Sequence, residues 1–312
     1  MSLPTTALLH AIDADKTKLD AARPLPVHTL ASLREKLTLE WTYHSNAIEG
    51  NTLTLRETKV VLEGITVGGK SLREHFEATN HRDAILYVEA IVAKNEALSE
   101  WQIRNIHSLV LKSIDDKEAG RYRQENVVIA GASTTPPDFL HLPEEMKSLV
   151  EWYEQADQLH PVERAAELHT RFVKIHPFVD GNGRTGRLLL NFELMKAGYP
   201  PAIIQKEDRL EYYDSLDEAC VSGDYGGITQ LVGNSVQRSL DTYLSVLGLR
   251  NYRRRAPPVT RRRLSHPTRR ETRSAGSVRD HRSCRWTQSA GPVQRRWSSA
   301  SAARFPSPPG SP

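Results

Sequence analysis

A glycine-rich turn between two helical patterns limits what this chain can fold into. In FVKIHPFVDGNGRTGRLLLNFEL, Phe172 to Leu194, apolar residues recur at helical spacing on both sides of the turn. The segment GNGRTG matches the glycine fingerprint of dinucleotide-binding folds, but that fingerprint requires a preceding strand within a βαβ unit. Because a helical pattern precedes the glycines here, we exclude that fold and expect a loop that connects two helices.

Helical periodicity continues through most of the first 249 residues. Leu33, Leu37 and Trp41 are spaced four apart, as residues on one face of a helix are. The one strong candidate for β structure is NVVIAGASTTPP, residues 126–137, where a β-branched run is followed by small residues and prolines. The sequence therefore predicts a mainly α-helical bundle with a small β-hairpin flap.

The basic charge of the chain is concentrated at its C-terminal end. Residues 250–312 carry sixteen arginines and only two acidic residues, Glu271 and Asp280, so the preceding residues are net acidic. This tail is rich in Arg, Ser and Pro and has few apolar residues to bury, which predicts disorder. It is either a nucleic-acid-binding arm or a non-native extension without selected function. The scattered arginines and the abrupt change at Arg250 favour the second interpretation, so we expect no nucleic-acid partner.

Cysteine content and hydropathy indicate the compartment. The chain has two cysteines, Cys220 and Cys284, too few for a disulfide framework. It has no apolar run of about eighteen residues, and its N-terminus lacks the cationic start of a signal peptide. We therefore expect a soluble, cytoplasmic protein with no membrane association.

The turn has the features of a phosphate-binding site. Gly181, Asn182 and Gly183 at a helix start present successive backbone N–H groups, and the helix dipole adds positive potential there. Arg184 and Arg187 are three residues apart in the first turn, so both can reach the same anion. These residues predict a cradle for phosphate groups.

Two further residues suggest chemistry at this cradle. Asp180 is an oxygen ligand suited to the Mg²⁺ that accompanies phosphates, and His176 stands where a base could take a proton from a hydroxyl. Each residue alone would more often have a structural role, but their combined spacing favours an anion-binding catalytic loop. The chain has no P-loop motif, H-E-x-x-H motif or paired C-x-x-C, which excludes the P-loop and zinc alternatives.

The segment His176–Arg187, HPFVDGNGRTGR, resembles the signature H-P-F-x-[DE]-G-N-G-R-x-x-R of the Fic family, whose members transfer AMP, or less often another phosphate-containing group, to protein hydroxyls. The resemblance extends over residues 31–249 and implies a Fic-type helical bundle. It divides the chain into a lead segment at 1–30, an inhibitory-helix region at 31–70, a Fic catalytic core at 71–249 and the disordered tail at 250–312.

The resemblance also implies roles at the loop. His176 would be the general base that activates a Ser, Thr or Tyr hydroxyl of a target protein, and Asp180 would hold Mg²⁺ between the α- and β-phosphates of ATP. Arg184 and Arg187 would bind the phosphates further along. The other nucleotide-binding positions of the loop would be Gly181, Asn182, Gly183, Thr185 and Gly186.

Two segments outside the loop would complete the nucleotide site. The flap would cover the nucleotide and align the target by strand-like pairing, and Tyr212 and Tyr213 would flank the adenine. The flap residues are Ile129, Ala130, Gly131 and Ala132. Cys220 stands near a position where a Fic relative has asparagine, so CTP and GTP stay open as donors beside ATP.

A second motif points to self-inhibition. SNAIEG, Ser45 to Gly50, matches the inhibitory signature [ST]-x-x-x-E-[GN] found before the core of some Fic proteins. The resemblance implies that Glu49 pairs with Arg187, as a bidentate contact in the place of the γ-phosphate. Without the Fic signature, the motif would be interpreted as an ordinary helix that ends at Gly50.

Two other functions remain open at this point. In one, the net reaction is de-AMPylation, with Glu49 orienting a water that attacks AMP-modified protein. In the other, the Fic core is the scaffold of a DNA-binding module that acts through the basic tail. The expected partners are a target protein and the chain itself through self-AMPylation, and a homodimer stays open.

Overall fold

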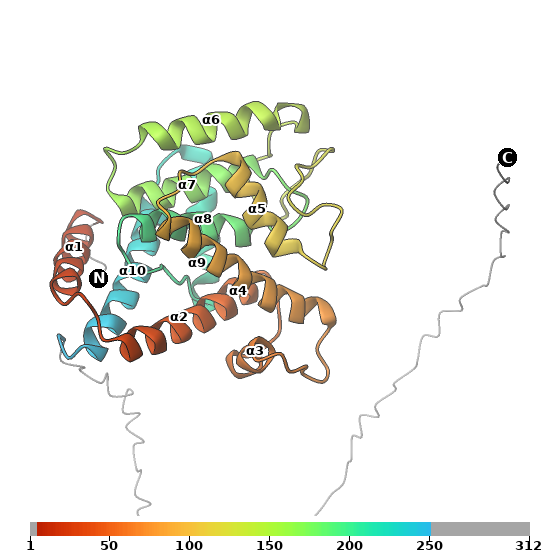
Figure 1. Cartoon of the computed structure of the whole chain (residues 1–312). Coiled ribbons are helices and arrows are strands. Elements are labelled where there is room, and N and C mark those ends of the chain that lie inside the picture. Colours follow the sequence, from red (N-terminus) through yellow and green to blue (C-terminus); the bar gives the residue numbers. More distant parts are fainter. Residues whose placement is uncertain (1–4, 251–312) are drawn as a thin grey trace, which may run out of the picture. The chain divides into compact units, whose positions relative to one another are not determined.

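The structure is a computed structural model that describes residues 5–250 (Figure 1). The predicted disordered tail is residues 250–312, and all of it except Arg250 lies outside the described part. In chain order the elements are α1 (Thr5–Ala21), α2 (Val27–Ile48), α3 (Leu55–Leu62), α4 (Leu72–Ala93), α5 (Glu100–Leu111), η1 (Phe139–His141), α6 (Leu142–Gln155), α7 (Pro161–Ile175), α8 (Asn182–Lys196), η2 (Lys206–Asp208), α9 (Arg209–Ser222) and α10 (Gly226–Val246). The prediction of a mainly α-helical bundle is confirmed. Among the described helices, none has the length and apolar character needed to span a membrane.

Local sequence signals fix where α4 begins. The side chain of Ser71 accepts a hydrogen bond from the backbone N–H of Glu74, and the Glu74 carboxylate accepts one from the N–H of Ser71, which together form a capping box. Hydrogen bonds from Thr52 and Ser71 lower the pKa of Glu74 to about 2. This cap places Arg73 in the first turn of α4.

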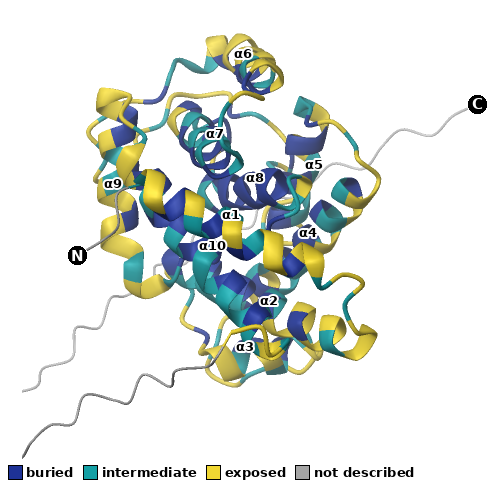
Figure 2. Ribbon diagram, turned by 90° about the vertical axis from the view of Figure 1, so that its left-hand side faces the viewer, coloured by how far each residue is buried: buried dark blue, intermediate teal, exposed yellow. Residues whose placement is uncertain are grey.

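Helix α8 lies at the centre of the bundle, against α7, α4, α5 and α2 (Figure 2). Its residues from Arg184 to Leu194 are all buried, whereas a surface helix would bury only one face. Several of these buried residues are polar or charged, and a buried charge is costly unless it is paired. The core helix therefore carries groups that require partners.

A second cluster joins the two ends of the described chain. Helices α1 and α10 pack together, with Leu8 and Ile12 of α1 against Gly233 of α10. A Cβ atom at Gly233 would lie only 2.8 Å from Leu8 Cδ2, so this close approach requires a residue without a side chain. The N-terminal helix is thus part of the packed bundle.

The predicted β-hairpin flap is wrong. Residues 121–138 contain no strand; Ile129 to Ala132 form a largely exposed turn that is closed by a hydrogen bond from Ala132 N–H to Ile129 O at 3.2 Å. After the turn, Ser133 N–H donates to Asp217 Oδ1 of α9 at 2.8 Å, and the chain reaches Pro136 and Pro137, which have no N–H to donate. The β-branched run has the propensity for a strand but no partner strand in the described chain.

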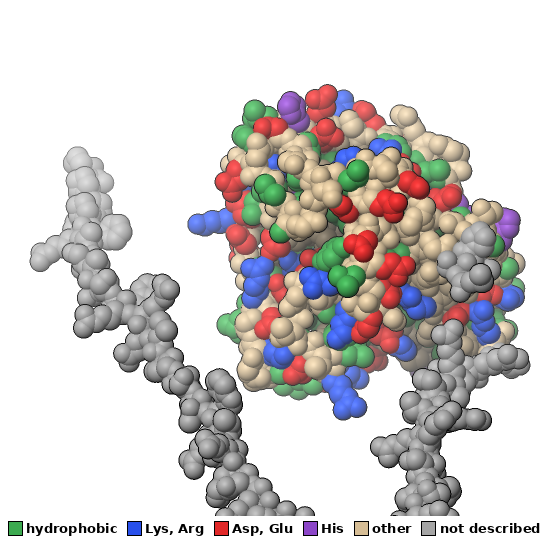
Figure 3. All heavy atoms as spheres, turned by 180° about the vertical axis from the view of Figure 1, so that it is seen from behind, with side chains coloured by type: hydrophobic (Ala, Val, Ile, Leu, Met, Phe, Trp, Pro, Cys, Tyr) green, Lys and Arg blue, Asp and Glu red, His purple; other side chains and the backbone are tan. Residues whose placement is uncertain are grey.

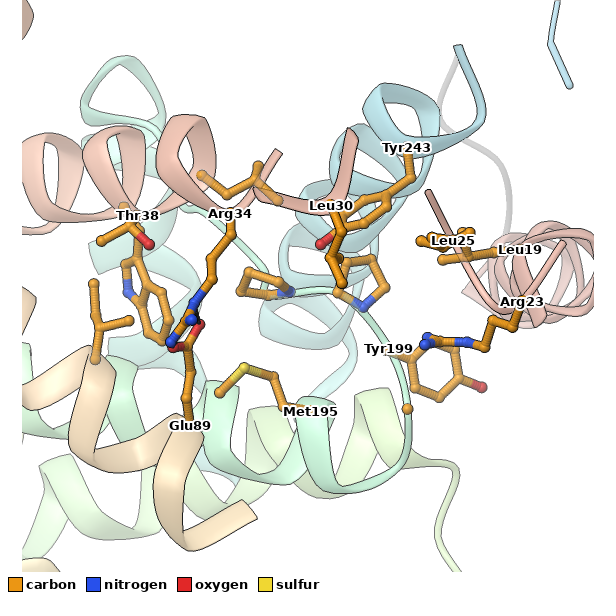
Figure 4. A pocket seen from close by; sticks show the side chains of 16 residues that line it. Leu19, Arg23, Leu25, Leu30, Arg34, Thr38, Glu89, Met195, Tyr199 and Tyr243 are labelled. Atoms are coloured by element: carbon orange, nitrogen blue, oxygen red, sulfur yellow. Dashed lines mark hydrogen bonds and ion pairs between the residues drawn. The ribbon is translucent and has the colours of Figure 1, made fainter. Parts of the chain in front are cut away.

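A cavity of about 220 Å³ lies beside the first half of α2 (Figure 4). Leu30 and Met195 contribute to its apolar lining. Its two arginines already have carboxylate partners: Arg34 Nε donates to Glu89 Oε2 at 2.9 Å, and Arg23 pairs with Asp20. Since these charges satisfy one another, the cavity offers no free charged group for a specific ligand.

Candidate active site

The signature loop connects α7 to α8 between two residues in the left-handed conformation. His176 ends α7 with φ 50° and ψ 57°, and Gly181 begins α8 with φ 78°. Glycine adopts this conformation freely, but for a histidine it is unfavourable and persists only where the surroundings hold it. The backbone of His176 must therefore be fixed by other parts of the chain.

Arg123 holds the start of the loop. Its Nε donates to His176 O at 3.0 Å, and its backbone N–H donates to Pro177 O at 2.9 Å. Its guanidinium also donates to the carbonyl oxygens of Glu125 and Pro137, at the two ends of the flap segment. This side chain is only 2% exposed, so one buried arginine ties the flap to the loop. The role of Arg123 was not predicted, and its only signal in the sequence is its place in GRYR, residues 120–123, just before the flap.

His107 of α5 holds the end of the loop. Its Nδ1 accepts a hydrogen bond from Gly120 N–H at 2.9 Å, so the proton is on Nε2, which donates to Asp180 O at 2.8 Å. The imidazole also stacks on Phe178, with 3.6 Å between ring centroids. Burial lowers the pKa of His107 to about 4 and keeps the ring neutral. Nothing in the sequence pattern marked this histidine as a support of the site.

Asn182 closes the loop on itself. Its amide oxygen accepts from Phe178 N–H at 3.0 Å and its amide nitrogen donates to Phe178 O at 2.7 Å. The side chain is thus committed to loop structure, and the backbone N–H, the group predicted to help cradle a phosphate, is the one left at the start of α8. The asparagine contributes to the cradle by shaping it.

The first turn of α8 contacts Glu49 at Gly183 and packs against the core at Thr185 and Gly186. A Cβ atom at Gly183 would lie 2.2 Å from Glu49 Oε1, so only glycine lets that carboxylate approach the helix start. Gly186 faces α7 instead, where a Cβ atom would lie 2.7 Å from His169 Nδ1, and Thr185 is fully buried. Of the predicted loop positions, Thr185 and Gly186 therefore serve the packing of α8.

Arg187 is the buried cation of the site, at 3% exposure. Its Nη2 donates to Glu49 Oε1 at 2.7 Å and to Ser45 O at 2.8 Å, its Nε donates to Ser45 Oγ at 3.0 Å, and its Nη1 donates to Tyr212 OH at 3.3 Å. Burial opposes the charge, but the Glu49 carboxylate raises the pKa of Arg187. The predicted partners are thus together. The expected bidentate contact is wrong, because the other donors of the guanidinium are taken by Ser45 and Tyr212.

Asp180 is the carboxylate of the loop. Its Oδ1 accepts from Gly181 N–H at 2.6 Å and from Arg184 Nη2 at 3.2 Å, and its Oδ2 contacts Arg73 Nη2. Burial opposes ionisation, but Arg184 and the loop N–H lower the pKa of Asp180. Within residues 5–250 no cluster of three metal-binding side chains exists. One ionised carboxylate beside a phosphate cradle fits Mg²⁺, which commonly takes one or two protein ligands and completes its shell with phosphates and water.

His176 has the protonation state that a base requires. Its side chain is mostly buried, and burial lowers its pKa below the ordinary value, with the charge of Arg123 acting in the same direction. The neutral imidazole is therefore the stable form near neutral pH. The loop thus combines a neutral base, an ionised carboxylate and a helix N-terminus within six residues.

The two predicted adenine-flanking tyrosines are placed differently. Tyr212 is only 1% exposed, and its hydroxyl bonds to His169 Nε2 at 2.7 Å as well as to Arg187, so its ring supports the arginine from within the core. Tyr213 is 37% exposed and donates to Ile48 O at the end of α2. The sequence pair YY does not show which of two adjacent helix positions faces inward. Cys220 is buried nearby, and its carbonyl accepts from Lys174 Nζ at 2.8 Å.

This arrangement defines a class of protein: a helical bundle in which the N-terminus and arginines of a buried central helix meet a carboxylate and a histidine of the loop that precedes it. Residues 97–194 match the Fic/DOC family, and the chain belongs to that family. It is 39% identical over 244 residues to "Protein adenylyltransferase Fic" of Nematostella vectensis, across 76% of this chain and 56% of the relative. The chain spans about half the length of the curated relatives it matches.

Solved structures agree with the family assignment. Residues 134–508 of Fic-1 from C. elegans superpose with a TM-score of 0.71 at 33% identity, covering 78% of this chain and 73% of that one. A Fic domain containing signaling protein from Bacteroides thetaiotaomicron gives a TM-score of 0.70 at 32% identity and covers 77% of this chain and 97% of its own. The Fic-type bundle inferred from the signature is therefore confirmed.

Proposed function

We propose that the protein is an adenylyltransferase that transfers AMP from ATP to a Ser, Thr or Tyr hydroxyl of a target protein, its own chain included. The observation that carries the proposal is the loop itself, which combines neutral His176, ionised Asp180 and the N-terminus of α8 above buried Arg187. The name of the relatives, protein adenylyltransferase Fic, supports the same reaction.

The proposed chemistry assigns each group a step. His176 takes the proton as the target hydroxyl attacks the α-phosphorus, a new P–O bond forms, and the bond to pyrophosphate breaks. The N–H groups at the start of α8 and the guanidinium of Arg187 bind phosphate oxygens and orient the chain of phosphates. Asp180 would hold Mg²⁺, which when bound neutralises phosphate charge. His107 and Arg123, which hydrogen-bond to the loop, keep these groups in place.

Glu49 is proposed to inhibit this reaction at rest. Its carboxylate occupies a donor of Arg187 and lies directly above Gly183, where a terminal phosphate would otherwise approach. ATP that binds beside it would have a displaced triphosphate, so its α-phosphorus would not be in line with the hydroxyl and the leaving group. Removal of Glu49 should then activate transfer.

De-AMPylation is the second candidate. The Glu49 carboxylate is 34% exposed although its partner Arg187 is buried, so an oxygen of Glu49 can bind a water molecule at the mouth of the site. That water would attack the phosphorus of an AMP-modified residue, the P–O bond to the protein would break, AMP would leave, and the released protein oxygen would take up a proton. The same residues would serve both reactions.

A nucleic-acid module is less well supported. The tail that motivated it lies outside the described residues, and the face of the described chain in Figure 3 carries acidic and basic side chains interspersed instead of a basic stripe. The cytoplasmic location and the homodimer stay predictions. Gel shifts with the full chain and with a chain that ends at residue 249 would test the tail.

Intact-mass measurement tests the main proposal. The full chain is incubated with Mg²⁺ and each nucleoside triphosphate in turn, as wild type and as the Glu49→Gly and His176→Ala variants. We expect AMP adducts with ATP, more of them in Glu49→Gly, and none above background in His176→Ala. Adduct formation that is equal in all three proteins would refute the assignment of the loop. The same samples show whether CTP or GTP replaces ATP.

A further inference from the structure

Arg73 lies outside the Fic signature but contacts its carboxylate. It stands in the first turn of α4, and its Nη2 contacts Asp180 Oδ2. Its Nε donates to Glu77 Oε1 at 3.1 Å, one turn further along α4. The arginine thus bridges α4 and the loop through two carboxylates.

The contact with Arg73 occupies Oδ2, the oxygen of Asp180 that the loop residues leave free. Gly181 N–H and Arg184 already donate to Oδ1, so Oδ2 is the oxygen left to bind a cation. A guanidinium on that oxygen and a divalent cation beside it would repel each other at short range. A metal ion can therefore bind Asp180 only as Arg73 moves away.

Of the two arginines on Asp180, only Arg73 is free to move. The side chain of Arg184 is 3% exposed and also lies 3.6 Å from Glu77, whereas that of Arg73 is 56% exposed. Rotation of the outer part of the Arg73 side chain would release Asp180 and could retain the contact with Glu77. The buried arginine is part of the site, and the exposed one is its movable counter-ion.

We propose that Arg73 is an internal competitor of the divalent cation: it neutralises Asp180 while the site is empty, and Mg²⁺ must displace it to bind. This inference rests on the proposed function, in which Asp180 is the metal ligand. Exposed ion pairs are worth up to about 1 kcal/mol, which corresponds to a roughly fivefold change in affinity. Removal of the Arg73 charge should tighten divalent-cation binding by about that factor.

Titration with Mn²⁺ tests the proposal without any turnover. Free Mn²⁺ is followed by its EPR signal in the full chain without nucleotide, for wild type, Arg73→Gln and Asp180→Asn. The matched control is Arg82→Gln, which removes the same charge from the same helix about 14 Å along its axis, and Arg82 contacts Asp83 instead of the loop. We expect about fivefold tighter Mn²⁺ binding in Arg73→Gln, little change in Arg82→Gln, and loss of this binding in Asp180→Asn.

Each other result overturns the proposal. Unchanged or weaker Mn²⁺ binding in Arg73→Gln would mean that Arg73 does not compete and only positions the carboxylate. An equal gain in Mn²⁺ affinity in Arg82→Gln would mean that the effect comes only from the net charge of the protein. In these cases the proposed function survives if Asp180→Asn loses the ion. If Asp180→Asn binds Mn²⁺ like wild type, Asp180 is not the ligand, and the metal assignment of the proposed function fails as well.

Discussion

Replacement of Glu49 by glycine is the sharpest test of the proposed resting state. The substitution removes one acceptor from Arg187 and leaves its three contacts with Ser45 and Tyr212, so the guanidinium should stay where it is. It also opens the space above Gly183, where Glu49 Oε1 now lies. The nucleotide then meets an unchanged arginine with a free donor.

The size of the effect follows from the geometry of the pair. A buried bidentate pair could hold about 99% of molecules inactive, which requires a bias of roughly 2.7 kcal/mol. Here the contact is one hydrogen bond of 2.7 Å, and the Glu49 side chain is 34% exposed, so solvent screens it. A charge-assisted bond discounted for this exposure is worth about 1.4 kcal/mol, or a factor of ten. We therefore expect self-AMPylation to rise about tenfold in Glu49→Gly.

The assay is the initial rate at which full-length protein incorporates label from ATP that carries it at the α-phosphate. Glu49→Gln is the control for helix shape, because glutamine keeps the length and an acceptor but not the charge. Its bond to the charged guanidinium loses only the charge of the acceptor, so we expect a smaller rise than in Glu49→Gly. In the double variant Glu49→Gly with Arg187→Ala, the rate of self-AMPylation should fall again, because the phosphate then lacks its arginine. Equal rates in wild type and Glu49→Gly, with equal ATP binding, would refute the reasoning.

Four further predictions concern the loop and its supports. Replacement of His176 by alanine should slow transfer by roughly 10²- to 10⁴-fold and leave ATP binding near normal in calorimetry. Because burial lowers the pKa of His176, kcat/KM should stay level from pH 8 to about 6.5 and fall only on further acidification. Asp180→Ala should lose Mg²⁺-dependent activity, and activity that persists in excess EDTA would contradict the metal assignment. The pKa of His107 near 4 means that its stabilising effect is full above pH 6.5 and is lost as pH falls towards 4; urea unfolding of His107→Gln should show a shallower loss over that window.

The sequence predicted well those features that depend on residues close together in the chain. Helix α8 and its N-terminal loop follow from spacing within Phe172–Leu194. The pairing of Glu49 with Arg187 joins residues far apart in the chain, and only the resemblance to the Fic family implied it. The prediction of a β-hairpin flap was wrong for a different reason. Its β-branched run is a local signal, but strand formation depends on a partner segment, and the described chain provides none.

The supports of the loop could not be predicted because they come from distant parts of the chain. Arg123 and His107 stand 53 and 73 residues before their loop partners, His176 and Asp180. The neighbourhood of His107 does not distinguish it from an ordinary helix residue, and that of Arg123 shows only that it precedes the flap. Their roles depend on burial, because a buried arginine or histidine must form hydrogen bonds within the protein, whereas an exposed one can bond to water. Only packing reveals that requirement.

Two charged groups of the site, Arg187 and Asp180, pair with opposite charges of the same chain. Glu49 pairs with Arg187, and Arg73 contacts Asp180, so the proposed phosphate-binding cation and the proposed metal ligand each have a partner from the protein itself. In the proposed reaction, a phosphate replaces the carboxylate and Mg²⁺ replaces the guanidinium, so each buried or half-buried charge exchanges one partner for another of the same sign. Buried Arg187 therefore does not pass through an unpaired state, which would cost several kcal/mol for a desolvated ion. Asp180 is partly exposed and also keeps its ion pair with Arg184. Binding of ATP and of Mg²⁺ should consequently be coupled, because release of only one side chain would leave the site with an unbalanced charge.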